Sequence, residues 1–284
     1  MDNLHSSNFL IIRNHQFYWE NRTYLMGILN VTPDSFSDGG QFTQLQKAVN
    51  HALMMEKQGA DIIDIGGQST RPGSKQITLT EELERVIPVI QAIRQQSSIP
   101  ISIDTTRVEV ARQAIAVGAD IINDISGGTF EPEIFSVAGK NQTPIILMHI
   151  KGTPETMQTL TDYQDLIGEI CQFFREQINI AMAKGVKSEQ IILDLGIGFA
   201  KTYEQNIKIL KNIQQFKRLG YPLLIGTSRK SFIGKILNQN DPQKRVWGTA
   251  ATCCFAIAQG ANILRVHDVA EMADVIKVAD VLFR

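Results

Sequence analysis

The sequence predicts an α/β protein, a single (β/α)8 barrel of the TIM type with an N-terminal β-hairpin. Eight short aliphatic runs alternate with segments of helical periodicity, which indicates parallel strands joined by crossover helices. Eight such units favour a closed barrel over an open sheet. Three of the runs are near copies with different last residues: Asp64 in 59–64, Asn123 in 118–123 and Arg265 in 260–265. Repeated strands with unlike polar ends are typical of a barrel whose active site lies at one end of its strands.

The first residues of the chain predict the hairpin. Two short runs of β-forming residues, 9–12 and 16–19, flank Asn14 and His15. This is the spacing of two strands joined by a tight turn. We expect residues 1–23 to form this hairpin and to close the bottom of the barrel.

Strands and helices then alternate along the rest of the chain. Thr78 and Glu81 have the spacing of a capping box at the start of one helix, and an apolar stripe over 167–182 ends at Gly185. No serine-rich, proline-rich or charged linker interrupts the alternation, so residues 1–284 are expected to form one domain. The strand candidates are 24–29, 61–65, 100–103, 120–122, 144–148, 190–193, 222–225 and 262–266.

Composition limits the classes of function. The chain has 284 residues, 43% of them hydrophobic, and can bury a large core, whereas its net charge of -1 gives no support for nucleic-acid binding. No apolar run approaches the ~20 residues of a membrane span, and the early run 9–12 is too short for a signal peptide. Cys171, Cys253 and Cys254 have neither metal-ligand nor disulfide-framework spacing. We therefore expect a cytoplasmic protein with no membrane or nucleic-acid partner.

Polar side chains stand at the carboxyl ends of the strand candidates, which in a barrel face the active site. Few of these side chains can be buried cheaply without partners. Their convergence therefore predicts a ligand site. They are Asn30, Asp64, Thr70, Arg71, Asp104, Asn123, Asp124, His149, Asp194, Ser228, Arg229, Lys230, Arg265 and His267.

Two sets among these side chains predict a ligand with two chemically different ends. Asp104, Asn123 and Asp194 suit the donors of a flat, amino-rich heterocycle, and Lys230 suits a ring oxygen or nitrogen. The other set suits an oxyanion such as phosphate, to which the Asn30 oxygen would bind through a magnesium ion. That set comprises Asn30, Arg71, Arg265 and His267.

The same residues also have structural interpretations. Asp104 and Asp124 can cap the helices that follow them, which is about as common for a strand-end aspartate as ligand binding. His149 has no second histidine or cysteine at ligand spacing, so we expect a hydrogen-bonded position behind the site. Asp64 receives no ligand role and is expected to be structural. The structural interpretation does not explain why acids and bases gather at one end of one barrel.

Two long loops, 30–40 and 66–74, are rich in turn-forming residues. The first of them carries Phe36. We expect both loops to close over the site as lids that exclude water.

These loops carry a resemblance to a known family. The segment 25–40 resembles the first signature of the dihydropteroate synthases, and 69–73, Ser-Thr-Arg-Pro-Gly, resembles the second. The other family positions follow in the family order, and the resemblance runs from residue 24 to the C-terminus. These positions are Asp104, Asn123 to Ile125, Met148 with His149, Gly152 to Pro154, Asp194 with Gly196, Gly198 and Phe199, Ser228 to Ser231, and Arg265 to Asp268.

The resemblance implies a folate-pathway transferase that joins a dihydropterin carrying a methyl diphosphate to p-aminobenzoate, releasing diphosphate with Mg²⁺ present. It also implies that the protein is a homodimer. Asn30 is the implied ligand of the Mg²⁺ ion. The implied pterin-ring residues are Asp104, Asn123, Asp194 and Lys230; those for diphosphate and its metal are Asn30, Arg265 and His267. Thr70 and Arg71 would guide loop closure, and Phe36, Phe199 and Ser231 would line the aminobenzoate site. The expected catalytic residues are Asp104, Lys230, Arg265, His267 and Arg71.

The sequence departs from the family pattern in its loops. Gln68 replaces the usual glutamate, Leu195 the usual proline and Ala200 the usual glycine, while Ile197 stands where phenylalanine is common and Lys151 is atypical. None of these positions is assigned to a ligand.

Two other functions fit part of the pattern. The corrinoid methyltransferases that use methyltetrahydrofolate resemble this barrel and would use Asp104, Asn123 and Asp194, but they give no role to loop 30–40 or to 228–231. A non-catalytic pterin-binding protein has no use for a diphosphate clamp. The stretch 247–258, which includes Trp247, Ala250, Ala251, Phe255 and Ala258, suits either core packing or a partner surface.

Overall fold

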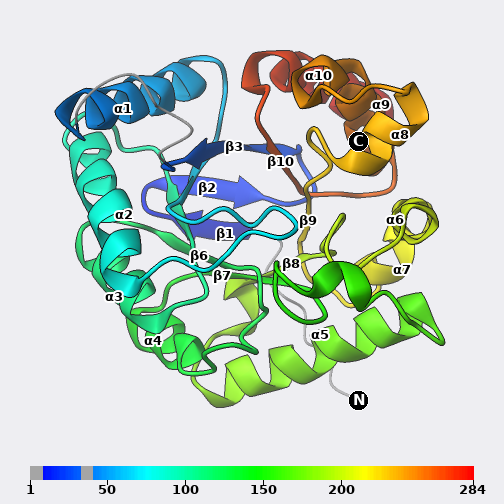
Figure 1. The fold of residues 1–284 in the computed structure, drawn as a ribbon, viewed down its shortest axis with the longest axis horizontal. Helices are drawn as coiled ribbons and strands as arrows, with labels where there is room; N and C mark the ends of the chain where they lie inside the picture. The colour runs from blue at the N-terminus through cyan, green and yellow to red at the C-terminus, as the bar shows by residue number, and fades with distance from the viewer. Residues whose placement is uncertain (1–8, 33–40) are drawn as a thin grey trace.

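A closed ring of eight parallel strands forms the centre of the computed structural model, which describes residues 9–32 and 41–284. The strands follow the order β10-β3-β4-β5-β6-β7-β8-β9, and the helices surround them (Figure 1). A separate antiparallel pair, β1 (Phe9–Ile12) and β2 (His15–Tyr18), precedes the barrel. The predicted fold class is therefore confirmed.

All eight predicted barrel strands are present. Seven begin one residue later than predicted, because a proline, aspartate, asparagine or glutamine at the predicted start belongs to the preceding turn. Several extend one or two residues further, so that Asp104, Asn123 and Asp194 lie within strands. The strands are β3 (Tyr24–Asn30), β4 (Ile62–Gly66), β5 (Ile101–Asp104), β6 (Ile121–Asp124), β7 (Ile145–Met148), β8 (Ile191–Asp194), β9 (Leu223–Ile225) and β10 (Ile263–Val266).

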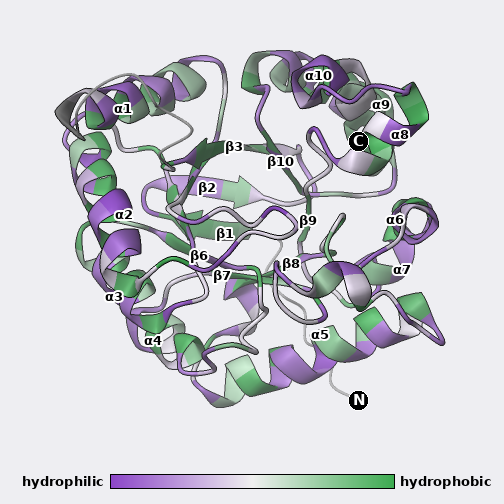
Figure 2. Ribbon diagram, viewed as in Figure 1, coloured by the Kyte–Doolittle hydropathy of each residue, from purple (hydrophilic) through white to green (hydrophobic). Residues whose placement is uncertain are grey.

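The helices bury apolar faces against the outside of the barrel, as their striped hydropathy shows (Figure 2). Thr78 caps α2 by accepting the Glu81 N–H, but the Glu81 carboxylate pairs with Arg85, so only half of the predicted capping box forms. The α5 stripe is buried and ends before Gly185, as predicted. The helices are α1 (Gln41–Lys57), α2 (Leu79–Arg94), α3 (Val108–Ala116), α4 (Ile134–Asn141), α5 (Leu166–Ala183), α6 (Tyr203–Leu210), α7 (Ile213–Lys217), α8 (Ser231–Leu237), α9 (Val246–Ala258) and α10 (Val269–Phe283), with 3-10 turns η2 (Met157–Thr159), η3 (Ser188–Gln190) and η4 (Pro242–Arg245).

The three near-copy segments begin with the same helix ending. Gly59, Gly118 and Gly260 have φ values of 105°, 115° and 96°, which favour glycine because other residues are strained there. The alanine after each glycine donates its N–H to a helix carbonyl five residues back, at 2.9, 2.8 and 3.0 Å. This is the Schellman arrangement, which ends a helix and directs the chain into the next strand.

The third residue of each copy joins neighbouring strands at the bottom of the barrel. Asp61, Asp120 and Asn262 each accept an N–H near the start of an adjacent strand, at 2.8, 2.9 and 2.9 Å. Two of them also hold the hairpin: Asp120 accepts the Arg13 Nε–H at 2.9 Å, and Asn262 donates to the Trp19 carbonyl at 2.8 Å. The repeated part of each copy therefore serves the fold.

The hairpin packs against the interior of the barrel. Leu10, Ile12 and Phe17 form one buried cluster with the first inward residues of the strands, such as Ile121 and Ile192. The hairpin therefore covers the bottom of the barrel, and the opposite end, where the strands finish, stays available to a ligand. Within the described ranges, no helix is both long and apolar enough to cross a bilayer.

Candidate active site

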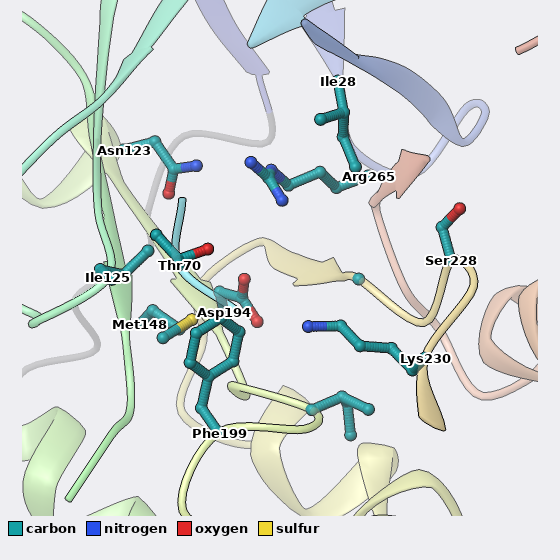
Figure 3. A pocket seen from close by; sticks show the side chains of 12 residues that line it. Ile28, Thr70, Asn123, Ile125, Met148, Asp194, Phe199, Ser228, Lys230 and Arg265 are labelled. Atoms are coloured by element: carbon teal, nitrogen blue, oxygen red, sulfur yellow. The ribbon is translucent and has the colours of Figure 1, made fainter. Parts of the chain in front are cut away.

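A pocket lies at the carboxyl ends of the strands, where the sequence predicted a ligand site. Polar side chains face one another across it, and Phe199, Met148 and isoleucines supply an apolar wall (Figure 3). Of that apolar wall, the family resemblance implies a ligand role only for Phe199; nothing in the pattern separated Met148 and the isoleucines from ordinary core. The lining residues are Ile28, Thr70, Asn123, Ile125, Met148, Asp194, Ile197, Phe199, Gly226, Ser228, Lys230 and Arg265.

Parallel pairing brings the predicted acids and amide together. Asp104 and Asn123 are register partners at the ends of β5 and β6, and Asp194 ends β8. All three side chains are buried, with exposed fractions of 7%, 2% and 7%. The Asn123 Oδ1 has no hydrogen-bond partner within the described part of the chain. The pocket therefore offers an unpaired acceptor, as recognition of an amino-rich ring requires.

Arg265 connects these residues to Asp64. Its Nε donates to Asp64 Oδ2 at 2.6 Å, and its NH2 donates to Asp104 Oδ2 at 2.7 Å. Asn123 Nδ2 also donates to Asp64 Oδ2, at 3.1 Å. Asp64, which the sequence pattern places at a strand end without a ligand role, is thus part of the polar network of the site. Arg265, which the sequence pattern assigns to the oxyanion end of the ligand, here contacts Asp104, which the pattern assigns to the ring.

Burial shifts the ionisation of the pocket groups. It raises the pKa of Asp104 to about 7, although the nearby Arg265 charge acts in the opposite direction. Burial also raises the pKa of Asp194, against the N–H of Gly196 that binds its carboxylate at 2.8 Å. It lowers the pKa of Lys230 to about 8, and the Arg265 charge adds to this shift. Asp104 and Lys230 therefore change charge near neutral pH, as is common at functional sites.

The loop after β9 directs Lys230 into the pocket. Arg229 has a left-handed backbone, with φ 59°, and its guanidinium pairs with Asp268 in the loop after β10. Its N–H is held by Thr249 Oγ1 on α9 at 3.1 Å. These contacts fix the turn, and the Lys230 ammonium lies 4.3 Å from the centre of the Phe199 ring. The cation and the aromatic wall therefore occupy the same side of the pocket.

His267 stands beside this loop as a neutral imidazole. Burial, followed by the charges of Arg229 and Arg265, lowers its pKa to about 3. Ser228 Oγ accepts the His267 backbone N–H at 3.1 Å and lies 3.0 Å from Nδ1. Either atom can be the donor in the contact with Nδ1: when the hydroxyl donates, the neutral ring carries its proton on Nε2, and when Nδ1 donates, Nε2 is an acceptor. Only the first tautomer offers an Nε2–H to an anion.

His149 lies behind the pocket and is hydrogen-bonded, as expected. Its Nδ1 is 3.0 Å from the ammonium of Lys201, a buried lysine that sequence reasoning did not single out. The same ammonium donates to the carbonyls of Phe199 and His149, at 2.8 and 3.3 Å. Lys201 therefore joins the ends of β7 and β8 beneath the aromatic wall. The sequence pattern does not single out Lys201 because this residue lies in a loop and not at the end of a predicted strand.

Other predicted site residues occupy different places. Thr70 lines the pocket, but Arg71 is exposed on the loop and Ser231 is exposed at the first turn of α8. Asn30 ends β3, half-buried, outside the set of residues that line the pocket. Phe36 lies outside the described residues.

Asp124 has a structural role, but it does not cap the following helix as one of its interpretations had it, because the cap position of α4 is Glu133. Its carboxylate accepts the N–H groups of Ser126 and Gly128 and the Ser126 hydroxyl, at 2.8, 2.7 and 2.7 Å. This organises the loop after β6 rather than contacting a ligand. Asp104, by contrast, pairs with Arg265, and the cap position of α3 is Arg107.

The departures from the family pattern have identifiable surroundings. Ile197 lines the pocket, a role that the sequence pattern did not predict, and Leu195 is buried. Ala200 has φ 49°, a conformation in which a glycine is less strained. Gln68 accepts the Ile77 N–H at 3.3 Å, and Lys151 pairs with Glu169 on α5 at 2.9 Å.

A closed barrel with an acid, an amide and two cations beside an apolar wall at the carboxyl ends of its strands has the site of a barrel enzyme that binds a small polar ligand. The family model of pterin binding enzymes matches residues 26–267. The chain belongs to this family, and relatives that are 66% and 47% identical to it are dihydropteroate synthases.

Three comparisons place the chain among them. A dihydropteroate synthase from Synechocystis sp. is 66% identical over 268 residues, which cover 94% of this chain and 93% of that protein. The structure of the Clostridium difficile enzyme in the presence of pteroic acid has a TM-score of 0.90 and 48% identity, covering 94% of this chain and 99% of that one. The Xanthomonas albilineans enzyme in complex with 7,8-dihydropteroate has a TM-score of 0.84 and 37% identity, covering 93% and 94%.

Proposed function

We propose that the chain condenses 6-hydroxymethyl-7,8-dihydropterin diphosphate with p-aminobenzoate, giving 7,8-dihydropteroate and diphosphate for folate biosynthesis. The observation that carries this transferase function is the pocket that joins ring-type acceptors to cations: Asn123 and Asp194 face Lys230 and Arg265 across one cavity. The identity to dihydropteroate synthases over nearly the whole chain supports the same activity.

The reaction requires charge separation rather than a protein nucleophile. The carbon–oxygen bond to diphosphate breaks with its electron pair leaving on the diphosphate, the aromatic amine attacks the exposed carbon, and the amine loses a proton to solvent or to the anion. Carboxylates at the ring stabilise the developing cation, and Arg265, Lys230 and His267, in the tautomer that carries its proton on Nε2, stabilise the departing anion. The apolar wall excludes water and positions the weakly basic amine.

Magnesium fits this site as a partner of the diphosphate. Mg²⁺ usually binds one or two protein oxygens, substrate phosphates and several waters. Asn30 offers one amide oxygen at the end of β3, and the described residues contain no group of three or more acidic, histidine or cysteine ligands. Such a donor set suits a metal that arrives with the substrate. When bound, the metal would neutralise charge on the leaving group.

The other two functions are less well supported. A corrinoid methyltransferase leaves Lys230 and the locked loop 228–230 without a role, and the relatives at high identity are dihydropteroate synthases. A scaffold has no need for Lys230 and Arg265 in the same pocket as the ring acceptors. Both alternatives are distinguishable by turnover.

The test is a reaction of the purified chain with the pterin diphosphate, p-aminobenzoate and Mg²⁺. We expect release of diphosphate and formation of dihydropteroate, with competition by a sulfonamide. Ring binding without turnover would favour the scaffold. The absence of both ring binding and turnover would contradict the proposal. Turnover that is unaffected by chelation of Mg²⁺ would contradict the metal assignment alone.

We also propose a cytoplasmic homodimer. Cys171 and Cys253 are buried free thiols, which suits a reducing compartment. On α9, Trp247, Ala251 and Phe255 are exposed, so core packing is not the role of this side of the helix. Large apolar surfaces of this kind are typical of protein interfaces.

A further inference from the structure

Asp64 contacts two of the side chains that face the ligand while lying fully buried itself. Its Oδ2 accepts both the Arg265 Nε–H, at 2.6 Å, and the Asn123 Nδ2–H, at 3.1 Å. Its Oδ1 has no partner among the described residues. The side chain therefore acts on the pocket through its neighbours.

The contact with Asn123 determines which way the amide faces. A carboxylate only accepts hydrogen bonds, so Asn123 must turn its Nδ2 towards Asp64. Its Oδ1 is then left without a partner in the described chain, and the residue lines the pocket. In Figure 3 the nitrogen of Asn123 lies towards Arg265 and the oxygen lies away from it. Through this contact, Asp64 makes Asn123 present its oxygen, a hydrogen-bond acceptor, and not its nitrogen to a ring in the pocket.

The contact with Arg265 has a second consequence. Arg265 holds Asp64 through Nε and Asp104 through NH2. A ring that hydrogen-bonds to Asp104 competes with the second contact, whereas the first contact lies deeper, on a side chain with no exposed surface. One carboxylate can therefore stay paired with Arg265 while the other is released to the ligand.

We infer that Asp64 is a positioning residue for the ring site: it fixes the amide of Asn123 and remains the counter-ion of Arg265 when Asp104 turns to the ligand. The inference rests on the proposed function in taking a pterin ring as the ligand.

Asp64→Asn in the full chain tests this inference, with calorimetry against two separate probes. The ring probe is 6-hydroxymethyl-7,8-dihydropterin, and the anion probe is inorganic diphosphate with Mg²⁺. The introduced amide can donate to Asn123 Oδ1, so the Asn123 amide can turn its nitrogen to the ring. The variant also lacks the charge that holds Arg265, so Arg265 stays paired with Asp104. For both reasons we expect ring affinity to fall at least tenfold. Arg265 keeps its place and loses a negative neighbour, so diphosphate affinity should be unchanged or somewhat tighter.

Ser102→Ala is the matched control. Ser102 is the register partner of Asp64 on β5 and is fully buried, but its hydroxyl has no hydrogen-bond partner within the described chain and so forms no hydrogen bond with Arg265 or Asn123. We expect wild-type affinity for both probes. In an Asn123→Ala background, Asp64→Asn should cost less ring affinity than it does alone. If the losses of the two single variants simply add in the double variant, Asp64 does not act on the ring through Asn123.

Ring affinity of Asp64→Asn within twofold of wild type would overturn the inference, and so would an equal loss for both probes, which indicates a merely structural role. If the variant does not fold, a structure of the wild-type chain with the ring probe decides the question. We expect Arg265 to keep Asp64 and to lose Asp104; the reverse would overturn the inference. A wild-type chain that binds neither probe would instead contradict the proposed function.

Discussion

Asp104 illustrates how burial prepares a side chain for a ligand. Its carboxylate lies at the end of β5, almost without exposed surface, and burial raises its pKa to about 7 against the opposing charge of Arg265. A raised carboxyl pKa means that the folded state retains a proton which the unfolded chain releases near pH 4. The stability contribution of this group is therefore present at low pH and declines as the pH rises through about 7.

Asp104→Asn should separate binding from stability. The variant loses a charge-assisted hydrogen bond to the ring, worth about 1.5–3 kcal/mol, so ring affinity should fall by about 10- to 150-fold. It also removes the ionisation that burial disfavours, so its Tm at pH 8 should equal or exceed that of the wild type. Calorimetry and thermal unfolding measure the two effects. A clear drop in Tm with ring affinity intact would contradict this account.

Lys230→Ala should weaken pterin binding and turnover. Burial lowers the Lys230 pKa to about 8, so the wild-type ammonium loses its charge as the pH rises above that value. We expect kcat/KM for the pterin substrate to decline above about pH 8 in the wild type and to lose this decline in the variant. Lys235→Ala, an exposed lysine one turn further along α8, is the control and should behave as wild type. Wild-type binding and turnover in Lys230→Ala would remove this residue from the site.

At the scale of elements, the glycines that end α1 and α3 have the same backbone conformation but different surroundings. Gly59 and Gly118 share a positive φ, but a Cβ at Gly59 would lie 3.4 Å from Ala273, an ordinary contact. A Cβ at Gly118 would lie 3.0 Å from Arg94, which is held by Asp120 and by the Ile99 carbonyl. The second site therefore combines backbone strain with a neighbour that has little freedom to move.

Gly59→Ala should lower the free energy of unfolding by about 1–2 kcal/mol through backbone strain alone. Gly118→Ala should lower it further, because the added methyl group also displaces Arg94. Urea unfolding of the two variants measures the difference. Equal losses, or a larger loss at Gly59, would show that Arg94 adapts without cost.

At the scale of the molecule, the exposed apolar surface is concentrated on neighbouring helices near the C-terminus. Trp247 and Phe255 on α9 are exposed by 77% and 42%, and Val278 and Val281 on α10 by 63% and 86%. These two helices contact each other, and α8 lies beside them (Figure 1). Such a surface is where we expect the second copy of the proposed homodimer.

Trp247→Glu should convert the dimer to a monomer, because a buried charge in an apolar interface has no partner. Light scattering after size-exclusion chromatography measures the mass. Ile11→Glu is the control: Ile11 is 54% exposed on the hairpin at the bottom of the barrel, away from the proposed interface, and its substitution should leave the mass unchanged. A dimeric Trp247→Glu variant would place the interface elsewhere.

The sequence by itself determined the local structure and the side of the barrel that carries chemistry. Aliphatic runs and capping residues act over a few positions, and parallel strands necessarily bring their carboxyl ends together. Asp104, Asn123 and Asp194 could therefore be placed in one site without a structure. The tertiary structure decided what depends on contacts between distant residues: Asp64 meets Arg265 across 201 positions, and Lys201 reaches His149 from another loop. It also decided which face of α9 stays exposed. Side-chain partners and pKa values depend on three-dimensional burial, which periodicity along one chain does not encode.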